Sequence, residues 1–153
     1  QEILINLPLI GRKFHSKFQN YKDNYYQKEL TFVDAVSGCF FLMKSEALKA
    51  ISFFDEDVFL YYEENITGKK LSQKGYKVAL ANEVVVLHDH SISIDRSMNA
   101  INKFKMLKKS QYYFEENYNR ASNVQLFFLK LTSSITLLTL YIRLFIYNKF
   151  KKK

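Results

Sequence analysis

The stretch FFDEDVFLYYEENITGKKLSQKGYKVAL, residues 53–80, decides how this chain is expected to fold. Its middle places acidic residues first and lysines last, and Gly75 follows the lysines. Acids near the beginning of a helix and bases near its end suit the helix dipole, and glycine suits a left-handed C-terminal cap. The pattern therefore predicts a helix that begins near Tyr62 or Glu63 and ends just before Gly75.

An apolar run and a short helix are expected before this helix. Residues 32–43, FVDAVSGCFFLM, are consistent with a buried strand, in which Gly38 marks a bulge or a close backbone approach. Ser45 fits the N-cap of a short helix over residues 46–51.

Two β-branched segments follow the central helix. Residues 76–80 and 83–87 predict strand, turn and strand, and His88 and His90 close the second strand. Residues 97–117 predict a second long helix, with apolar side chains on one side and lysines on the other.

The C-terminal stretch, residues 123–150, is rich in Leu, Ile and Phe. Lys130 and Arg143 leave 12 uncharged residues between them, which is short of the roughly 20 residues that a membrane-spanning helix needs. An amphipathic helix that lies on the membrane interface and ends in lysines is the better interpretation.

The composition is that of a folded chain with an uneven charge. With 153 residues, 48% of them hydrophobic and 25% charged, the chain suits one domain with a core and not a disordered polymer. Residues 1–100 hold 12 basic and 13 acidic side chains, whereas residues 101–153 hold 11 and 2. A basic tail indicates an anionic partner, either a membrane surface or nucleic acid, although merely solvated lysines would give the same charge.

Three simple features bear on the setting of the protein. The single Cys39 cannot form an internal disulfide, which favours a reducing, cytosolic compartment. No secretory signal opens the sequence, which begins with Gln rather than Met. We therefore expect a fragment whose first part is missing.

Four motif blocks, taken in their order, carry a family resemblance. The chain resembles family 2 glycosyltransferases of the rhamnosyltransferase-like kind over about residues 32 to 94. The blocks, in sequence order, are VDAVSGCFFLMKSEAL, FDEDVFLYYEENI, KKLSQKGYKVAL and VVVLHDHSIS. Each block alone is weak, and their shared order and spacing favour the family without indicating the sugar.

The resemblance implies a fold class and a division of the chain. The family has the GT-A fold, a Rossmann-like α/β domain, whose N-terminal half binds the nucleotide-sugar and holds an Asp-x-Asp metal motif. Residues 1–96 would be the C-terminal half of that domain, which carries the acceptor and catalytic side. Residues 97–153 would be a helical extension with an apolar, lysine-rich membrane tail. Asp55-Glu56-Asp57 falls at a turn of the family pattern, so a structural turn is its better interpretation.

An inverting transfer needs a base that takes the proton of the acceptor hydroxyl, and a positioned carboxylate can serve. Glu63 and Glu64 lie together directly after Tyr61 and Tyr62, where repulsion and partial desolvation by the aromatics should raise one pKa. The family commonly has Glu-Asp here and uses the Asp, which matches Glu64. We predict Glu64 as the base and Glu63 as its orienting neighbour. Many relatives show another acid where this chain has Asn65 or Ile66, which leaves the exact base open, and two acids at a helix start are the structural alternative.

Four further residues are expected to bind substrate by their place in the family pattern. Gly38 would let a ligand approach the backbone, and Asp34 would accept a hydrogen bond from a sugar hydroxyl. Tyr61 and Tyr62 would stack on sugar rings. A strand bulge, a solvated acid and aromatic packing are the structural alternatives at these positions.

His88 and His90 are expected to help hold a divalent metal or the donor diphosphate, as a His at this position does in the family. The metal would be Mn or Mg, held mostly by the missing N-terminal half. Zinc is a poor alternative, because Cys39 cannot complete a tetrahedral site with the two histidines.

The leading hypothesis is an inverting glycosyltransferase that uses a nucleotide-sugar donor and a lipid-linked or polysaccharide acceptor. It would act at the cytosolic face of the cell membrane, in cell-wall or capsule polysaccharide synthesis, and bind anionic lipid. Residues 1–153 alone are expected to be inactive, because the donor half would be absent. The alternative is a non-catalytic remnant or accessory module that binds a membrane or a partner protein. A nucleic-acid partner is not expected, since no recognition motif accompanies the charge.

Overall fold

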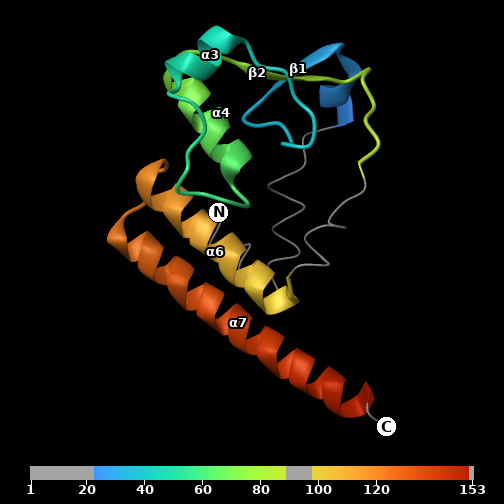
Figure 1. The fold of residues 1–153 in the computed structure, drawn as a ribbon, viewed down its shortest axis with the longest axis vertical. Coiled ribbons are helices and arrows are strands. Elements are labelled where there is room, and N and C mark those ends of the chain that lie inside the picture. The colour runs from blue at the N-terminus through green and yellow to red at the C-terminus, as the bar shows by residue number, and fades with distance from the viewer. Residues whose placement is uncertain (1–22, 89–97, 152–153) are drawn as a thin grey trace. The chain divides into compact units, whose positions relative to one another are not determined.

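The computed structural model describes residues 23–88 and 98–151 (Figure 1). The chain divides into two compact units, one of residues Tyr21–Ser97 and the other including residues Met98–Lys153. Each unit has its own architecture and is treated separately. The division of function expected at residues 96 and 97 stays a prediction.

The first unit contains a two-stranded antiparallel sheet. Strand β1 covers Leu30–Val33 and strand β2 covers Val78–Ala81, in the register that pairs Leu30 with Ala81 and Val33 with Val78. The 3-10 helix η1, Asp23–Gln27, precedes β1. The side chain of Thr31, 3% exposed, donates a hydrogen bond to the Tyr25 carbonyl at 2.8 Å. This bond fixes the beginning of β1 against η1.

The long buried strand expected over residues 32–43 is wrong beyond Val33. The backbone leaves the sheet there and runs as a loop with a turn at Gly38. Leu42 is 94% exposed and Phe40 is 59% exposed. An apolar run forms a strand only where a neighbouring strand completes its hydrogen bonds, and β2 pairs with β1 over four residues only.

The strand expected over residues 83–87 is also wrong. This segment has no strand partner among the described residues, and Val85 and Leu87 are 92% and 95% exposed. β2 ends at Ala81, and a turn follows in which the Val84 N–H donates to the Ala81 carbonyl at 3.3 Å. β-branched composition favours a strand, but the register with β1 decides which segment pairs.

Helix α3, Ser45–Ala50, lies beside the hydrophobic core of this unit. Its N-cap is Lys44, because the Leu48 N–H donates to the Lys44 carbonyl. No side chain makes a capping hydrogen bond at this end of the helix. The expected Ser45 cap is therefore wrong by one residue. The core consists of three buried side chains with partly buried neighbours, namely Ala47, Ile51 and Leu71 with Met43, Leu48 and Val78.

Helix α4, Glu63–Gln73, confirms the helix predicted from the charges of residues 63–74. Gly75 follows with φ of +80°, which confirms the left-handed cap that a glycine accepts without strain. Along α4, Ile66, Gly68 and Leu71 are buried, and Ile66 is 1% exposed. The helix thus keeps an inner face despite its polar composition.

The second unit is a helical hairpin of α6, Ala100–Asn117, and α7, Asn123–Lys151. Asn99 caps α6, because its side-chain oxygen accepts the Asn102 N–H at 2.9 Å. Ser122 and Gln125 form a reciprocal capping box at the start of α7, with bonds of 2.8 and 3.3 Å. Both helices confirm the sequence prediction, although α6 begins at Ala100.

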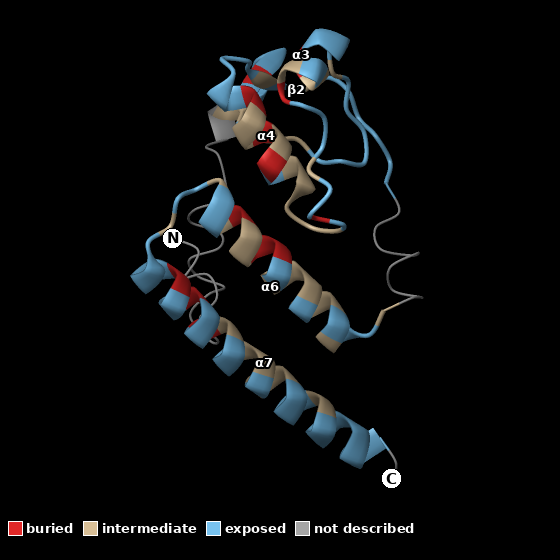
Figure 2. Ribbon diagram, turned by 60° about the vertical axis from the view of Figure 1, so that its left-hand side comes forward, coloured by how far each residue is buried: buried red, intermediate tan, exposed pale blue. Residues whose placement is uncertain are grey.

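Contacts along the hairpin show that α6 and α7 run antiparallel (Figure 1). The Lys130 ammonium lies 4.3 Å from the Tyr112 ring centre, and the Lys105 ammonium lies 6.0 Å from that of Tyr141. Six residues are buried in the two helices, namely Ser110, Gln111, Phe114, Leu126, Leu129 and Thr132. Figure 2 shows that one side of α7 is partly covered while the other is exposed.

The described residues contain one small antiparallel sheet and helices. The larger Rossmann-like sheet implied by the family resemblance is not present among these residues, and they do not contradict it. The GT-A fold class stays a prediction.

Gly68→Ala should lower the free energy of unfolding by about 1–3 kcal/mol, the usual cost of overpacking. A Cβ at this position would lie 2.1 Å from the Asp34 carbonyl oxygen, which belongs to backbone and cannot move aside cheaply. Urea unfolding followed by circular dichroism measures the change.

Gly75→Asn is the matched control, because no atom lies within 4 Å of its added Cβ and asparagine accepts a left-handed backbone. It should cost less than about 1 kcal/mol. Equal losses in the two variants would contradict the steric account of Gly68.

Candidate functional site

The candidate site lies where the loop after β1 meets α4. The Asp34 carbonyl oxygen approaches Gly68 so closely that any larger residue there would collide with it. Gly68 is buried in the middle of the helix, where glycine costs roughly 1 kcal/mol relative to alanine. That cost is offset because the loop can then lie directly on the helix.

A hydrogen bond joins the same loop to the beginning of α4. The Gly38 N–H donates to Oε1 of Glu64 at 2.9 Å, across 26 residues of sequence. A Cβ at residue 38 would lie 2.8 Å from that oxygen. The close approach expected at Gly38 therefore exists, but in the structure a carboxylate of the chain itself makes it. Glu64 is half-buried, and its carboxylate is held in one orientation at the edge of the loop.

Glu63 occupies a less polar position than its neighbour. Partial burial raises the pKa of Glu63, and the negative charge of Glu64 adds to the rise, while a hydrogen bond from the backbone of Glu63 itself opposes it. Oε2 of Glu63 is shielded from solvent and has no hydrogen-bond partner among the described residues. Of the two adjacent carboxylates, Glu63 is thus one whose pKa is raised.

Tyr61 and Tyr62 lead into α4 with an unusual backbone. Their φ angles are 67° and 70°, in the left-handed region that non-glycine residues seldom adopt. Tyr62 is the N-cap and supplies no capping side chain, and its carbonyl accepts the first helical bond, from the Ile66 N–H at 2.9 Å. Such strain persists only where surrounding contacts fix it. The loop that precedes these residues is tied to α4, because the Lys70 ammonium donates to the Phe53 carbonyl at 2.7 Å.

Asp34 joins this site through its backbone. Its carbonyl oxygen faces Gly68, and the residue as a whole is exposed. The roles in sugar binding expected for Asp34, Tyr61 and Tyr62 stay predictions.

The chain reaches the Glu64 contact and His88 from opposite ends of the sheet. The Glu64 contact lies beyond the end of β1 that pairs with Val78, whereas the chain reaches His88 from the opposite end of β2. At that opposite end, the Asn82 amide donates to the Lys28 carbonyl at 2.6 Å. His88 is exposed and follows an unpaired segment rather than a strand, and His90 lies outside the described residues.

The acidic triplet Asp55-Glu56-Asp57 is a turn, as the sequence predicted. Oδ1 of Asp55 accepts the Asp57 N–H at 2.9 Å, the bond of an Asx turn. Within residues 23–88 and 98–151, no three His, Cys, Asp or Glu side chains are grouped to hold a metal ion. The metal expected from the family resemblance, held mostly by an N-terminal half, stays a prediction.

Sequence reasoning missed Gly68, although a signal for it exists. A glycine inside an otherwise regular helix lowers helix stability and usually has a packing reason. The missing information was the partner, the Asp34 carbonyl, which lies 34 positions earlier in the chain.

Comparison with models of known protein families, with curated proteins and with solved structures finds no match for this chain. The resemblance to glycosyltransferases therefore rests on the order of the four motif blocks. Any function assigned to the site has to be argued from its own geometry.

Glu63→Gln should raise the stability of the protein at neutral pH. Because burial raises the pKa of Glu63, the folded chain binds more protons than the unfolded chain between the two pKa values, so stability falls as pH rises through that interval. The neutral amide removes this loss. The gain should be below about 1 kcal/mol at pH ~7, since the side chain is partly exposed and screened, and should vanish near pH ~3.

Urea unfolding at both pH values measures this effect, with Glu56→Gln as the charge-matched control at an exposed position. A gain that is the same at both pH values, or equally large in the control, would show that the effect does not come from titration of Glu63.

Proposed function

We propose that this chain supplies the catalytic base and the acceptor side of an inverting glycosyl transfer, with Glu64 as the base. The observation that supports this most is the hydrogen bond from the Gly38 N–H to Glu64, at 2.9 Å. It brings together two of the four motif blocks on which the family resemblance depends. A base must be held within reach of the hydroxyl it deprotonates, and this contact holds the carboxylate.

The geometry leaves Glu64 equipped for proton transfer. Oε1 is bound to the Gly38 N–H, and no other hydrogen bond to the carboxylate occurs among the described residues, so Oε2 is available. As the acceptor oxygen forms its bond to the anomeric carbon, its proton moves to Oε2. The bond between that carbon and the donor phosphate oxygen breaks, and the nucleotide diphosphate leaves with the electron pair. The configuration inverts, and Glu64 then returns the proton to water.

Glu63 modulates this base rather than replacing it. Its raised pKa means that its carboxyl group takes up a proton at a higher pH than an ordinary glutamate does. Protonation of Glu63 removes a negative charge beside the proposed base. The charge next to the base therefore depends on pH.

The substrates we propose are a nucleotide-sugar donor and a hydroxyl of a glycan or lipid-linked sugar. Tyr61 and Tyr62, immediately before the carboxylates, offer aromatic rings of the kind that stack on sugars. Their fixed backbone limits the directions in which those rings can point. The steps assigned to this chain use its own side chains, and none depends on a metal.

In the full-length protein that contains this chain, Glu64→Gln should reduce transfer by roughly 10²–10⁴-fold, the usual contribution of a general base. The amide oxygen of glutamine still accepts the Gly38 N–H, so the fold and donor binding should stay nearly unchanged. Initial rates with a panel of nucleotide-sugars, with and without manganese, measure the loss of transfer. Thermal shift with the same donors measures whether the fold and donor binding are kept.

Glu56→Gln is the matched control and should transfer at the wild-type rate, because Glu56 is exposed and lies outside the site. Turnover retained in Glu64→Gln would remove Glu64 from the role. A large loss in Glu63→Gln with normal Glu64→Gln would assign the base to Glu63 instead.

Gly38→Ala tests the positioning of the base separately. The added Cβ would meet the end of the flexible Glu64 side chain at 2.8 Å, so the carboxylate can swing aside while the fold is kept. We expect kcat to fall by at least tenfold with the urea midpoint nearly unchanged, because a misplaced group costs rate rather than stability. Normal kcat in a folded Gly38→Ala protein would show that the observed orientation of Glu64 is not required.

A further inference from the structure

Helix α7 carries an exposed apolar line that we name the outer stripe. Its seven residues are between 42% and 70% exposed, namely Val124, Phe128, Leu131, Ile135, Leu138, Ile142 and Phe145. They follow one another at alternating intervals of four and three positions, which places them along one side of a helix. Figure 2 shows this side of α7 as exposed along its length.

The outer stripe is not the side of α7 that packs on α6. The buried residues of α7, Leu126, Leu129 and Thr132, occupy other positions on the helix. At about 100° per residue, Leu126 and Leu129 lie on the opposite side from Leu131 and Leu138. The helix is therefore apolar on two sides, of which α6 covers one.

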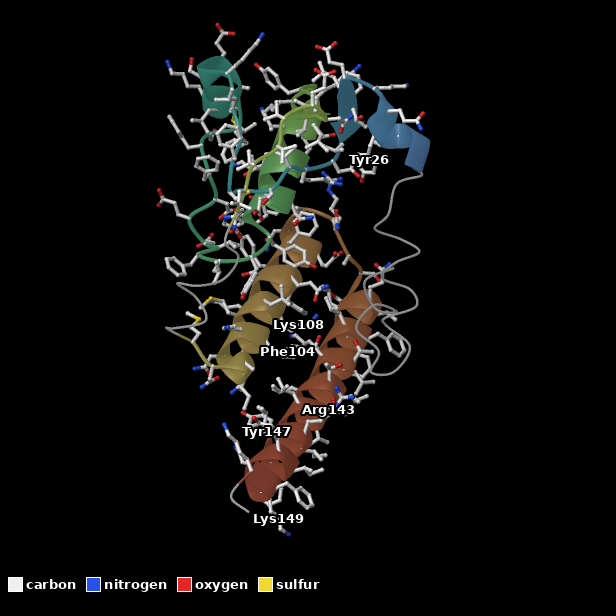
Figure 3. The ribbon with its side chains drawn as sticks, turned by 90° about the vertical axis from the view of Figure 1, so that its right-hand side faces the viewer. Tyr26, Phe104, Lys108, Arg143, Tyr147 and Lys149 are labelled. Atoms are coloured by element: carbon white, nitrogen blue, oxygen red, sulfur yellow. The ribbon has the colours of Figure 1, made fainter. Side chains whose placement is uncertain are left out.

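Positive charges border the outer stripe on both flanks. At about 100° per residue, Lys130 and Arg143 project to opposite sides of it. Lys149 and Lys151 follow near the C-terminal end, and Figure 3 shows Arg143, Tyr147 and Lys149 along this half of the helix. An apolar strip between basic side chains, with aromatics near one end, is the composition of helices that lie in a membrane interface.

The polar groups of α7 are compatible with an apolar environment. The hydroxyls of Thr132, Thr136 and Thr139 donate to carbonyls of the preceding turn of the same helix, at 2.8–2.9 Å. Their donors are thus satisfied without water. Entry of this part of the helix into lipid would leave none of these three donors unpaired.

By length and composition alone, α7 could also cross a membrane. Its partner α6 argues against a spanning position. α6 lies along α7, as the contacts of Lys105 with Tyr141 and of Tyr112 with Lys130 show, and it carries four lysines in all. A spanning α7 would take α6 and those charges into the hydrocarbon, where charged side chains are costly.

We propose that the α6–α7 hairpin binds the surface of an anionic lipid bilayer, with α7 in the membrane plane and the outer stripe inserted below the headgroups. Arg143 then contacts anionic headgroups on one flank of the stripe, while the Lys130 ammonium stays on the Tyr112 ring of α6, which lies on the side of α7 away from the lipid. Membrane binding by the hairpin does not depend on the proposed glycosyl transfer, and it can be tested without any enzyme activity.

Charge favours lipid over a second copy of the chain as the occupant of the stripe. Residues 123–151 include no acidic side chain, whereas four residues there are basic, namely Lys130, Arg143, Lys149 and Lys151. Two copies joined through the stripe would bring only positive charges together. Anionic lipid supplies the opposite charge, at a surface that attracts such clusters.

Leu138→Glu should weaken binding of the full chain to phosphatidylglycerol-containing vesicles at least tenfold, because it places a charge in the centre of the stripe. Gln125→Glu is the matched control, with the same change of net charge at an exposed residue of α7 off the stripe, and its carboxylate keeps the capping bond to the Ser122 N–H. Co-sedimentation measures both, and circular dichroism confirms that both variants are folded. Vesicles of phosphatidylcholine alone should bind wild type at least tenfold more weakly. Equal binding by the two variants, or equal binding to both vesicle types, would overturn the proposal.

The chain contains no Trp, so Leu131→Trp introduces a single reporter of depth on the stripe. Lipids brominated near the headgroup end of the acyl chain should quench its fluorescence more than lipids brominated near the chain terminus. Stronger quenching by the deep bromines would indicate a spanning helix and overturn the in-plane position. Sedimentation velocity without lipid should show a monomer, and a dimer that Leu138→Glu dissociates would assign the stripe to a second copy.

Discussion

The first unit depends on one steric constraint, the direct contact between the loop after β1 and helix α4. Gly68 allows the Asp34 carbonyl to reach the helix, and Gly38 allows the Glu64 carboxylate to reach the loop. The first contact involves backbone and fixes the fold, whereas the second involves a flexible side chain and fixes an orientation. The close contact between the loop and α4 that stabilises the unit therefore also positions the Glu64 carboxylate. One region of the fold thus serves both stability and the proposed chemistry.

The beginning of α4 combines three features that each cost free energy. Tyr61 and Tyr62 hold a left-handed backbone, Glu63 has a partly desolvated carboxyl group, and Glu64 lies directly beside it. Strain and perturbed titration gather at functional sites more often than elsewhere. Here the compensation is visible in the Gly38 and Lys70 hydrogen bonds, which hold the loop and the helix in place.

Local signals in the sequence predicted the helices and the strand near residues 76–80, whereas nonlocal pairing decided against the strands expected at residues 34–43 and 83–87. The charges around residues 63–74 and Gly75 were enough to place α4, since helix ends are encoded within a few residues. The segment VVVL has the stronger β composition, yet β1 pairs with VALA. That choice depends on register and on the Asn82 contacts with the beginning of β1, which lie about fifty positions away. For the same reason the carboxylate pair was predictable, whereas the contact of Glu64 with Gly38, 26 positions away, was not.

The pairing of β1 with β2 also has a consequence for the order of folding. Thr31 and Asn82, which meet at one end of the sheet, are separated by 51 positions, and both α3 and α4 lie within that interval. A ribosome must release the whole interval before the sheet can close, while the helices can form earlier from local contacts. Closure of so long a loop is slow relative to helix formation. During synthesis, the backbone N–H and C=O groups of β1 therefore have no partner strand until β2 has left the ribosome.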